Sequence, residues 1–190
     1  HWSVLVADIC GRGPTAAARA GVVRHSFRMS AWHGDAPVQI LDWLNRALRS
    51  ADDDVFCTAA VASIDRIDDV VELTCALGGH PQPLLCRADG TVEPFGEYGM
   101  LLGTDLDVRN IATTTRLERG DAVVFYTDGI TDVAPPHHLT DDELSALVAT
   151  AWSKSSSATD LADHLLLEAD RVRSLDQRTD DIALLVLRRT

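Results

Sequence analysis

The chain has 190 residues, of which 46% are hydrophobic and 24% are charged, a balance typical of globular domains. Acidic residues outnumber basic ones 29 to 17, giving a formal net charge of −12. This charge argues against nucleic acid and against an anionic membrane surface as the main partner, because both attract Lys and Arg. No apolar run approaches the roughly 20 residues that a membrane-spanning helix needs, and the first residues show no signal-peptide pattern.

The N-terminal part is predicted to contain one strand and two helices. Residues 3–7, SVLVA, are a short apolar run that ends at Asp8 and is followed by a glycine loop. An Ala-rich segment that opens with a proline predicts a helix over 14–32. A second helix is predicted over 36–50, capped by Asp35, with a stripe of Ile and Leu on one face.

The middle of the chain is predicted to form antiparallel strands. FCTAAVASID and VVELTCALG are two apolar runs joined by an acidic turn, which is typical of a hairpin. LLCRADGTVEPF predicts another hairpin that turns at Asp89-Gly90. Further strands are predicted over 110–117 and, from DAVVFY, over 121–126.

The C-terminal part is predicted to add two helices and a last strand. Residues 140–143, TDDE, match a capping box that opens the first of these helices. The second is predicted over 159–173, and a buried strand, IALLVL, begins at Ile182. Since the strands come mostly as hairpins, the pattern favours an α+β fold of antiparallel sheets with grouped helices over a doubly wound parallel sheet.

Three aspartates, Asp8, Asp128 and Asp180, each stand at the end of a hydrophobic strand. If these ends converge, two carboxylates about 4 Å apart repel by roughly 4 kcal/mol at an effective dielectric of 20, a cost that cations offset. Mg²⁺ and Mn²⁺ prefer such oxygen ligands, and no His lies in the three motifs to favour zinc or non-haem iron. Two such ions with a bridging water perform phosphoester hydrolysis.

Simpler interpretations stay open for each motif. The D-G pair at Asp128 is also a common hairpin turn, Asp180 is also compatible with a solvated loop edge, and Asp8 with an Asx-turn. GRGPT lacks the Gly-Lys-Ser/Thr of a phosphate-binding P-loop, so that interpretation is rejected. His80, within GGHPQP, is weak evidence of catalysis by itself.

The four cysteines, Cys10, Cys57, Cys75 and Cys86, contain no C-x-x-C pair, which excludes a zinc ribbon or a thioredoxin-like motif. Three lie in strand-like runs, and we expect buried small hydrophobes in a reducing compartment, the cytoplasm, rather than disulfides. Cys10 lies in a glycine-bounded loop, where a reactive thiol is the alternative.

Five motifs in order, VADICGRG, FCTAAVASID, GGHPQPLL, GDAVVFYTDGITD and TDDIALLVL, resemble the SpoIIE/RsbU-type branch of the PPM (PP2C-like) protein phosphatases. The resemblance runs from about Trp2 to Leu187 and implies an α-β-β-α sandwich of two antiparallel sheets flanked by helices. The family's acidic GGDxxD motif, which normally precedes DICGRG, is not in this sequence. Because the chain also starts at His1 without Met, we expect one N-terminally truncated PPM domain over 1–190, lacking a first strand or strands and belonging to a longer multidomain protein.

The resemblance implies a site of two Mn²⁺ or Mg²⁺ ions. Asp8 falls on the family's metal-bridging aspartate, Asp128 on the aspartate of YTDG, and Asp180 on the first aspartate of the C-terminal pair. Ile9 falls where a backbone carbonyl holds a metal. The three carboxylates are implied to act through a metal-bound water.

Lower-ranking positions lie in the same motifs. Gly11 gives the loop its tight path, and His80 belongs to a motif that shapes the rim of the site. Asp132 falls where the family often has an acidic residue, which either supports the ligands or caps the surface, and Asp181 falls on a position that is usually polar. Arg12 is implied to face the phosphate, since an arginine fork suits phosphate oxygens, with an exposed loop arginine as the alternative.

The implied activity is hydrolysis of phosphoserine or phosphothreonine on a protein, usually a STAS-domain anti-sigma factor antagonist. No covalent phosphoenzyme is expected, so Cys10 is not the nucleophile. The alternative is a non-catalytic PPM-like binding or regulatory module, favoured by the missing GGDxxD motif and opposed by the three retained aspartates. A sensor domain in the parent chain and a second copy of this domain are candidate partners, through the two N-terminal helices.

Overall fold

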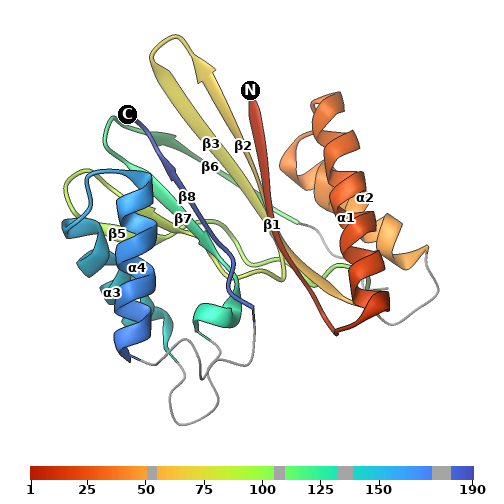
Figure 1. Ribbon diagram of the computed structural model, residues 1–190. Coiled ribbons are helices and arrows are strands. Elements are labelled where there is room, and N and C mark those ends of the chain that lie inside the picture. The colour runs from red at the N-terminus through yellow and green to blue at the C-terminus, as the bar shows by residue number, and fades with distance from the viewer. Residues whose placement is uncertain (51–54, 105–109, 132–138, 173–180) are drawn as a thin grey trace. The chain divides into compact units, whose positions relative to one another are not determined.

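The computed structural model describes residues 1–50, 55–104, 110–131, 139–172 and 181–190 (Figure 1). In chain order, its elements are β1 Trp2–Ile9, α1 Pro14–His33, α2 Pro37–Arg49, β2 Cys57–Ile67, β3 Val70–Gly78, β4 Leu84–Cys86, β5 Val92–Pro94, β6 Ala112–Leu117, β7 Ala122–Tyr126, the 3₁₀ helix η1 Asp128–Ile130, α3 Asp141–Ser153, α4 Ala158–Val172 and β8 Leu184–Arg188. None of the helices in these ranges is long and apolar enough to cross a membrane.

The chain divides into two units that interleave along the sequence. Unit 1 comprises residues 1–82 and 96–116, and unit 2 comprises residues 83–95 and 117–190. Each unit has its own antiparallel sheet and its own pair of helices. The predicted α+β class with two antiparallel sheets is therefore confirmed.

The sheet of unit 1 has the strand order β1-β2-β3-β6. Strands β1 and β2 pair from Trp2–Ile64 to Ile9–Cys57, so the whole of β1 lies along β2. Helices α1 and α2 pack on this sheet (Figure 1). The predicted stripe on α2 is confirmed, because its four apolar residues are buried there: Ile40, Leu41, Leu44 and Leu48.

The turn between the two helices differs from the prediction. Helix α1 ends at Gly34, which has a left-handed φ of 80°. The N-cap of α2 is Ala36 because Pro37 takes the first helical position, and the Ala36 N–H donates to the Gln39 side chain at 2.9 Å. Asp35 lies one residue too early to cap the helix, and its carboxylate instead accepts a hydrogen bond from Ser30.

The sheet of unit 2 has the strand order β5-β4-β7-β8, and α3 and α4 pack on it. β4 and β8 flank β7, and all five residues of β7 are buried, three of them in the cluster with α3 and α4: Ala122, Val124 and Tyr126. The predicted turn between β4 and β5 is confirmed: the Thr91 N–H donates to the Asp89 carboxylate at 2.9 Å, and Gly90 has a positive φ of 96°. The capping box of α3 is confirmed by reciprocal bonds between Thr140 and Glu143.

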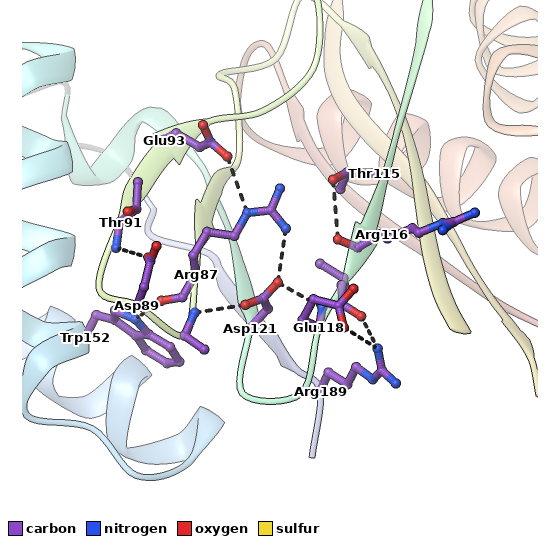
Figure 2. A network of polar contacts seen from close by, with 12 residues as sticks. Arg87, Asp89, Thr91, Glu93, Thr115, Arg116, Glu118, Asp121, Trp152 and Arg189 are labelled. Atoms are coloured by element: carbon purple, nitrogen blue, oxygen red, sulfur yellow. Dashed lines mark hydrogen bonds and ion pairs between the residues drawn. The ribbon is translucent and has the colours of Figure 1, made fainter. Parts of the chain in front are cut away.

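A buried carboxylate holds the turns of unit 2 together (Figure 2). The side chain of Asp121 is 3% exposed and accepts three hydrogen bonds, from the N–H groups of Ala88 and Glu118, each at 2.9 Å, and from Arg87 Nη1 at 3.0 Å. The carbonyl of Arg87 in turn accepts a bond from the Trp152 indole at 2.9 Å, which connects the turn to α3. The carboxylate thereby fixes where β4 ends and β7 begins.

Candidate functional site

The end of strand β1 carries the first predicted site residues. Asp8 is partly exposed and pairs across the sheet with Thr58, and Ile9 pairs with Cys57. One residue later, the N–H of Cys10 still donates to the carbonyl of Phe56 at 2.9 Å. Asp8 and the carbonyl of Ile9 thus belong to regular sheet, which fixes their backbone positions.

The loop that follows needs its glycines. Gly11 and Gly13 have φ angles of 104° and 83°, a region that side chains rarely adopt. Arg12, between them, is exposed. The backbone thereby turns within a few residues from the end of β1 into α1.

The thiol of Cys57, the residue paired with Ile9 at the end of β1, is protonated at neutral pH. Burial, and in second place the negative charge of Asp8, raise the pKa of Cys57 to about 12. Cys57 is also only 1% exposed, whereas Asp8 offers a partly exposed carboxylate at this strand end. Oxygen donors with a negative charge fit a hard divalent cation such as Mg²⁺ or Mn²⁺.

The GGHP motif lies next to the start of β2, the strand that pairs with the end of β1. His80 follows β3 and is 1% exposed, and its Nδ1 forms a hydrogen bond of 2.9 Å with Thr58 Oγ1. Gly79, with a φ of 67°, bridges to Ala59 of β2. The histidine belongs to unit 1 and contacts the residue that pairs with Asp8.

In unit 2, Asp128 follows strand β7. It is partly exposed and begins the 3₁₀ helix η1, whose turn closes with a 2.7 Å bond from the N–H of Thr131 to the Asp128 carbonyl. The alternative of a hairpin turn at this D-G pair is wrong, because the backbone enters a helical turn after β7. Asp128 therefore stands at a strand end, as the carboxylate pattern predicts.

A buried threonine ties this segment to the chain that precedes β8. Thr127 is 4% exposed, and its N–H donates to the carbonyl of Ala183 at 3.0 Å. Its Oγ1 accepts from the Ala183 N–H at 2.9 Å and donates to the Asp181 carbonyl at 3.2 Å. These bonds hold the TDG motif next to Asp181, the second aspartate of the TDD motif. The side chain of Asp181 is exposed.

The predicted site residues thus form two local groups, one in each unit. Asp8, Ile9 and His80 lie in unit 1, and Asp128 and Asp181 lie in unit 2. Asp132 and Asp180 lie outside the described residues. Over the described ranges, no group of three or more His, Cys, Asp or Glu side chains is arranged to hold a metal.

Two positioning residues, Thr58 and Thr127, are not among the predicted site residues. Both are hydroxyl residues in otherwise apolar strand sequences, FCTAAV and VVFYTD. Thr127 directly precedes Asp128, so a hydroxyl next to a strand-end aspartate is a sequence signal for it, whereas Thr58 adjoins Asp8 only across the sheet and has no such signal.

Comparison with known proteins gives one consistent family. The family model described as "Stage II sporulation protein E (SpoIIE)" matches residues 1–190. The phosphoserine phosphatase RsbU of Bacillus subtilis (strain 168) is 27% identical over an alignment of 190 positions, which covers 98% of this chain and 55% of RsbU. The chain therefore spans about half the length of this curated relative.

Solved structures share the same fold. The RsbU and RsbW domains of Rv1364c from Mycobacterium tuberculosis match with a TM-score of 0.79 and 26% identity, covering 98% of this chain and 52% of that one. The SiaA-PP2C domain of Pseudomonas aeruginosa matches with a TM-score of 0.78 and 20% identity, covering 98% of this chain and 74% of that one.

Proposed function

The chain belongs to the SpoIIE family, and on that premise we propose that it removes phosphate from phosphoserine or phosphothreonine on a protein, with divalent metal ions as cofactors. The name of the relative RsbU, a phosphoserine phosphatase, supports the activity. The observation that carries the proposal is the position of Asp8 and Asp128, two partly exposed carboxylates that each lie where a strand of their own unit's sheet ends.

The proposed ligands of two Mn²⁺ or Mg²⁺ ions are the carboxylates of Asp8, Asp128 and Asp180 and the backbone carbonyl of Ile9. Bound ions of this kind supply an activated water and neutralise charge on the phosphoryl group. The chain itself contributes fixed oxygen donors, and Arg12 is proposed to contact the phosphate oxygens. Cys57 takes no part as a nucleophile, because its raised pKa keeps the thiol protonated.

The proposed substrate is a phosphorylated STAS-domain protein of a sigma-factor control system. The resemblance to the SpoIIE/RsbU branch supports it, and so does the solved relative that carries an RsbU and an RsbW domain in one protein. Regulation by a sensor domain or by a second copy of this domain is proposed through helices α1 and α2.

The test is hydrolysis of p-nitrophenyl phosphate with Mn²⁺, Mg²⁺ or EDTA. We expect metal-dependent turnover that Asp128→Asn lowers by about 100-fold or more, since losing a direct ligand should exceed the 10–100-fold cost of losing an outer partner. Asp163→Asn, the same change at an exposed position on α4, is the matched control and should keep full activity. Full metal-dependent turnover in Asp128→Asn would rule out the proposed ligand.

A non-catalytic binding module is the second candidate, favoured by the absence of a GGDxxD motif ahead of VADICGRG. Metal binding separates the two candidates without relying on activity. A ligand that binds only the native state stabilises it by about 2.7 kcal/mol at a hundredfold excess over its dissociation constant. A melting temperature that Mn²⁺ leaves unchanged, with no turnover, would favour the binding module.

A further inference from the structure

The GGHP segment of unit 1 lies next to the start of strand β2, where Gly79 bridges to Ala59. A Cβ added at Gly79 would lie 2.8 Å from the Leu101 backbone nitrogen, and one added at Gly78 would lie 2.9 Å from the Leu102 side chain. Leu102 exchanges two backbone bonds with Cys57, at 3.0 and 2.9 Å. The two glycines therefore let the turn after β3 pack closely against the segment that pairs with β2.

This close packing brings His80 to Thr58. The imidazole is 1% exposed, and a hydrogen bond of 2.9 Å joins its Nδ1 to Thr58 Oγ1. The bond forms with either tautomer, because the hydroxyl both donates and accepts. Buried polar contacts of this kind fix one arrangement of the chain, since an unpaired partner costs free energy.

Thr58 is the residue directly opposite Asp8 in the antiparallel pair of β1 and β2. Directly opposite residues point to the same face of a sheet, with Cβ atoms about 4.5–5.5 Å apart. The side chain that His80 holds is therefore the cross-strand neighbour of the proposed metal ligand. The backbone bond from Cys10 to Phe56 extends the same pairing past Asp8.

We propose that His80 is a positioning residue for Asp8 and acts through the hydroxyl of Thr58. This inference rests on the proposed metal-dependent function. His80 contacts neither substrate nor metal in this role. It holds the rotamer of Thr58 and the start of β2, and these limit where the carboxylate of Asp8 can lie. The glycines of GGHP serve the same role by allowing the approach.

The test measures Mn²⁺ affinity by titration calorimetry, together with the melting temperature in EDTA. Thr58→Val removes the hydroxyl and keeps the shape, and we expect it to weaken Mn²⁺ binding by about tenfold, as the loss of an outer partner does. Thr58→Ser restores the hydroxyl and should bind within about threefold of the unmodified chain. His80→Leu should weaken Mn²⁺ binding to a similar extent, and combining it with Thr58→Val should weaken it little further, because each change already removes the bond between Thr58 and His80.

The matched control is Thr74→Val. It removes a side-chain hydrogen bond of the same length, 2.9 Å, between Thr74 and Thr114 in the same unit. Because this bond is exposed, we expect little change in melting temperature and no change in Mn²⁺ affinity. If Thr58→Val and His80→Leu lower only the melting temperature and leave Mn²⁺ affinity unchanged, the contact is merely structural and the inference is overturned.

Two further outcomes are decisive. If the unmodified chain binds no Mn²⁺, the proposed function fails and this inference fails with it. If the unmodified chain binds Mn²⁺ and Thr58→Val does not fold, Thr58→Ser and His80→Asn decide, since Asn keeps a polar atom close to the position of Nδ1. Tight binding by His80→Asn and weak binding by His80→Leu would support the inference, and equal affinities would overturn it.

Discussion

A single threonine side chain connects the two acidic motifs of unit 2. The hydroxyl of Thr127 satisfies the N–H of Ala183 and the carbonyl of Asp181, and its own backbone bonds to Ala183 as well. Because Asp128 is the next residue, any shift of Thr127 moves the proposed ligand. The placement of this carboxylate is thus linked to the last strand of the sheet.

Thr127→Val should therefore lower both stability and activity. The substitution removes the acceptor of the Ala183 N–H, and because this bond is only part-buried we expect a loss of about 1 kcal/mol, the net value of a typical hydrogen bond. The measurement is urea denaturation followed by circular dichroism, alongside metal-dependent hydrolysis. Thr127→Ser should recover most of both properties. Thr150→Val, which removes only an exposed bond to the Ala146 carbonyl, should change neither, and an equal loss there would contradict the prediction.

At the scale of residues, the sequence predicts the aspartates but not their supports. Asp8 and Asp128 are visible because a carboxylate at the end of an apolar run is unusual. The partner of Thr58 lies 22 residues away and that of Thr127 lies 56 residues away. No local pattern encodes such pairs, because they form only when distant segments come together within each unit.

At the scale of elements, the hydrophobic period predicts most helices and strands, and their ends are less predictable. Strand β1 runs from Trp2 to Ile9, beyond the predicted 3–7, because pairing with β2 extends past the apolar residues. The cap of α2 shifts from Asp35 to Ala36 because Pro37 sets the first helical position. Pairing partners and proline geometry thus decide these boundaries.

The Asp121 carboxylate offers a test at this scale. Asp121→Asn replaces one acceptor oxygen by an N–H group that faces the donors of Arg87, Ala88 and Glu118, and it removes the charge that pairs with Arg87 (Figure 2). We expect a loss of roughly 2–4 kcal/mol in the free energy of unfolding. Chemical denaturation measures it.

The control for this prediction is Glu93→Gln. It makes the same acid-to-amide change on the other, exposed partner of Arg87, where the contact is 3.4 Å long. Exposed ion pairs contribute little, and the expected change is below about 1 kcal/mol. Similar losses in both variants would show that burial of Asp121 does not matter.

Over the whole molecule, the cysteines divide as the sequence predicts, three buried and Cys10 exposed, all as free thiols. Burial raises the pKa of Cys57, Cys75 and Cys86 from 9.0 to about 12, and nearby carboxylates add to this for Cys57 and Cys86. The folded state therefore holds these protons more tightly than the unfolded state.

The sign of the pH dependence follows from this shift. Stability from the protonated thiols is fully present below pH 9 and is lost as the pH rises toward 12. We expect the urea midpoint to fall across this range. At pH 8, Ellman's reagent should titrate one thiol in the native chain and four in guanidinium, and Cys10→Ser should remove the native signal. Rapid reaction of more than one native thiol would contradict the buried positions.

The interleaved order of the two units has a consequence for synthesis. Strand β4 ends at residue 86, but its sheet neighbour β7 is followed by β8 only at residues 184–188. At about 5–20 residues per second, a ribosome needs roughly 5–20 s to cover that interval. During this time β4 gains its neighbours β5 and β7, but β8 is still missing, and so at first are the helices α3 and α4 that cover the sheet. The nascent chain therefore exposes the apolar side chains of the β4–β5 hairpin during this interval, when binding by a chaperone would protect them from aggregation.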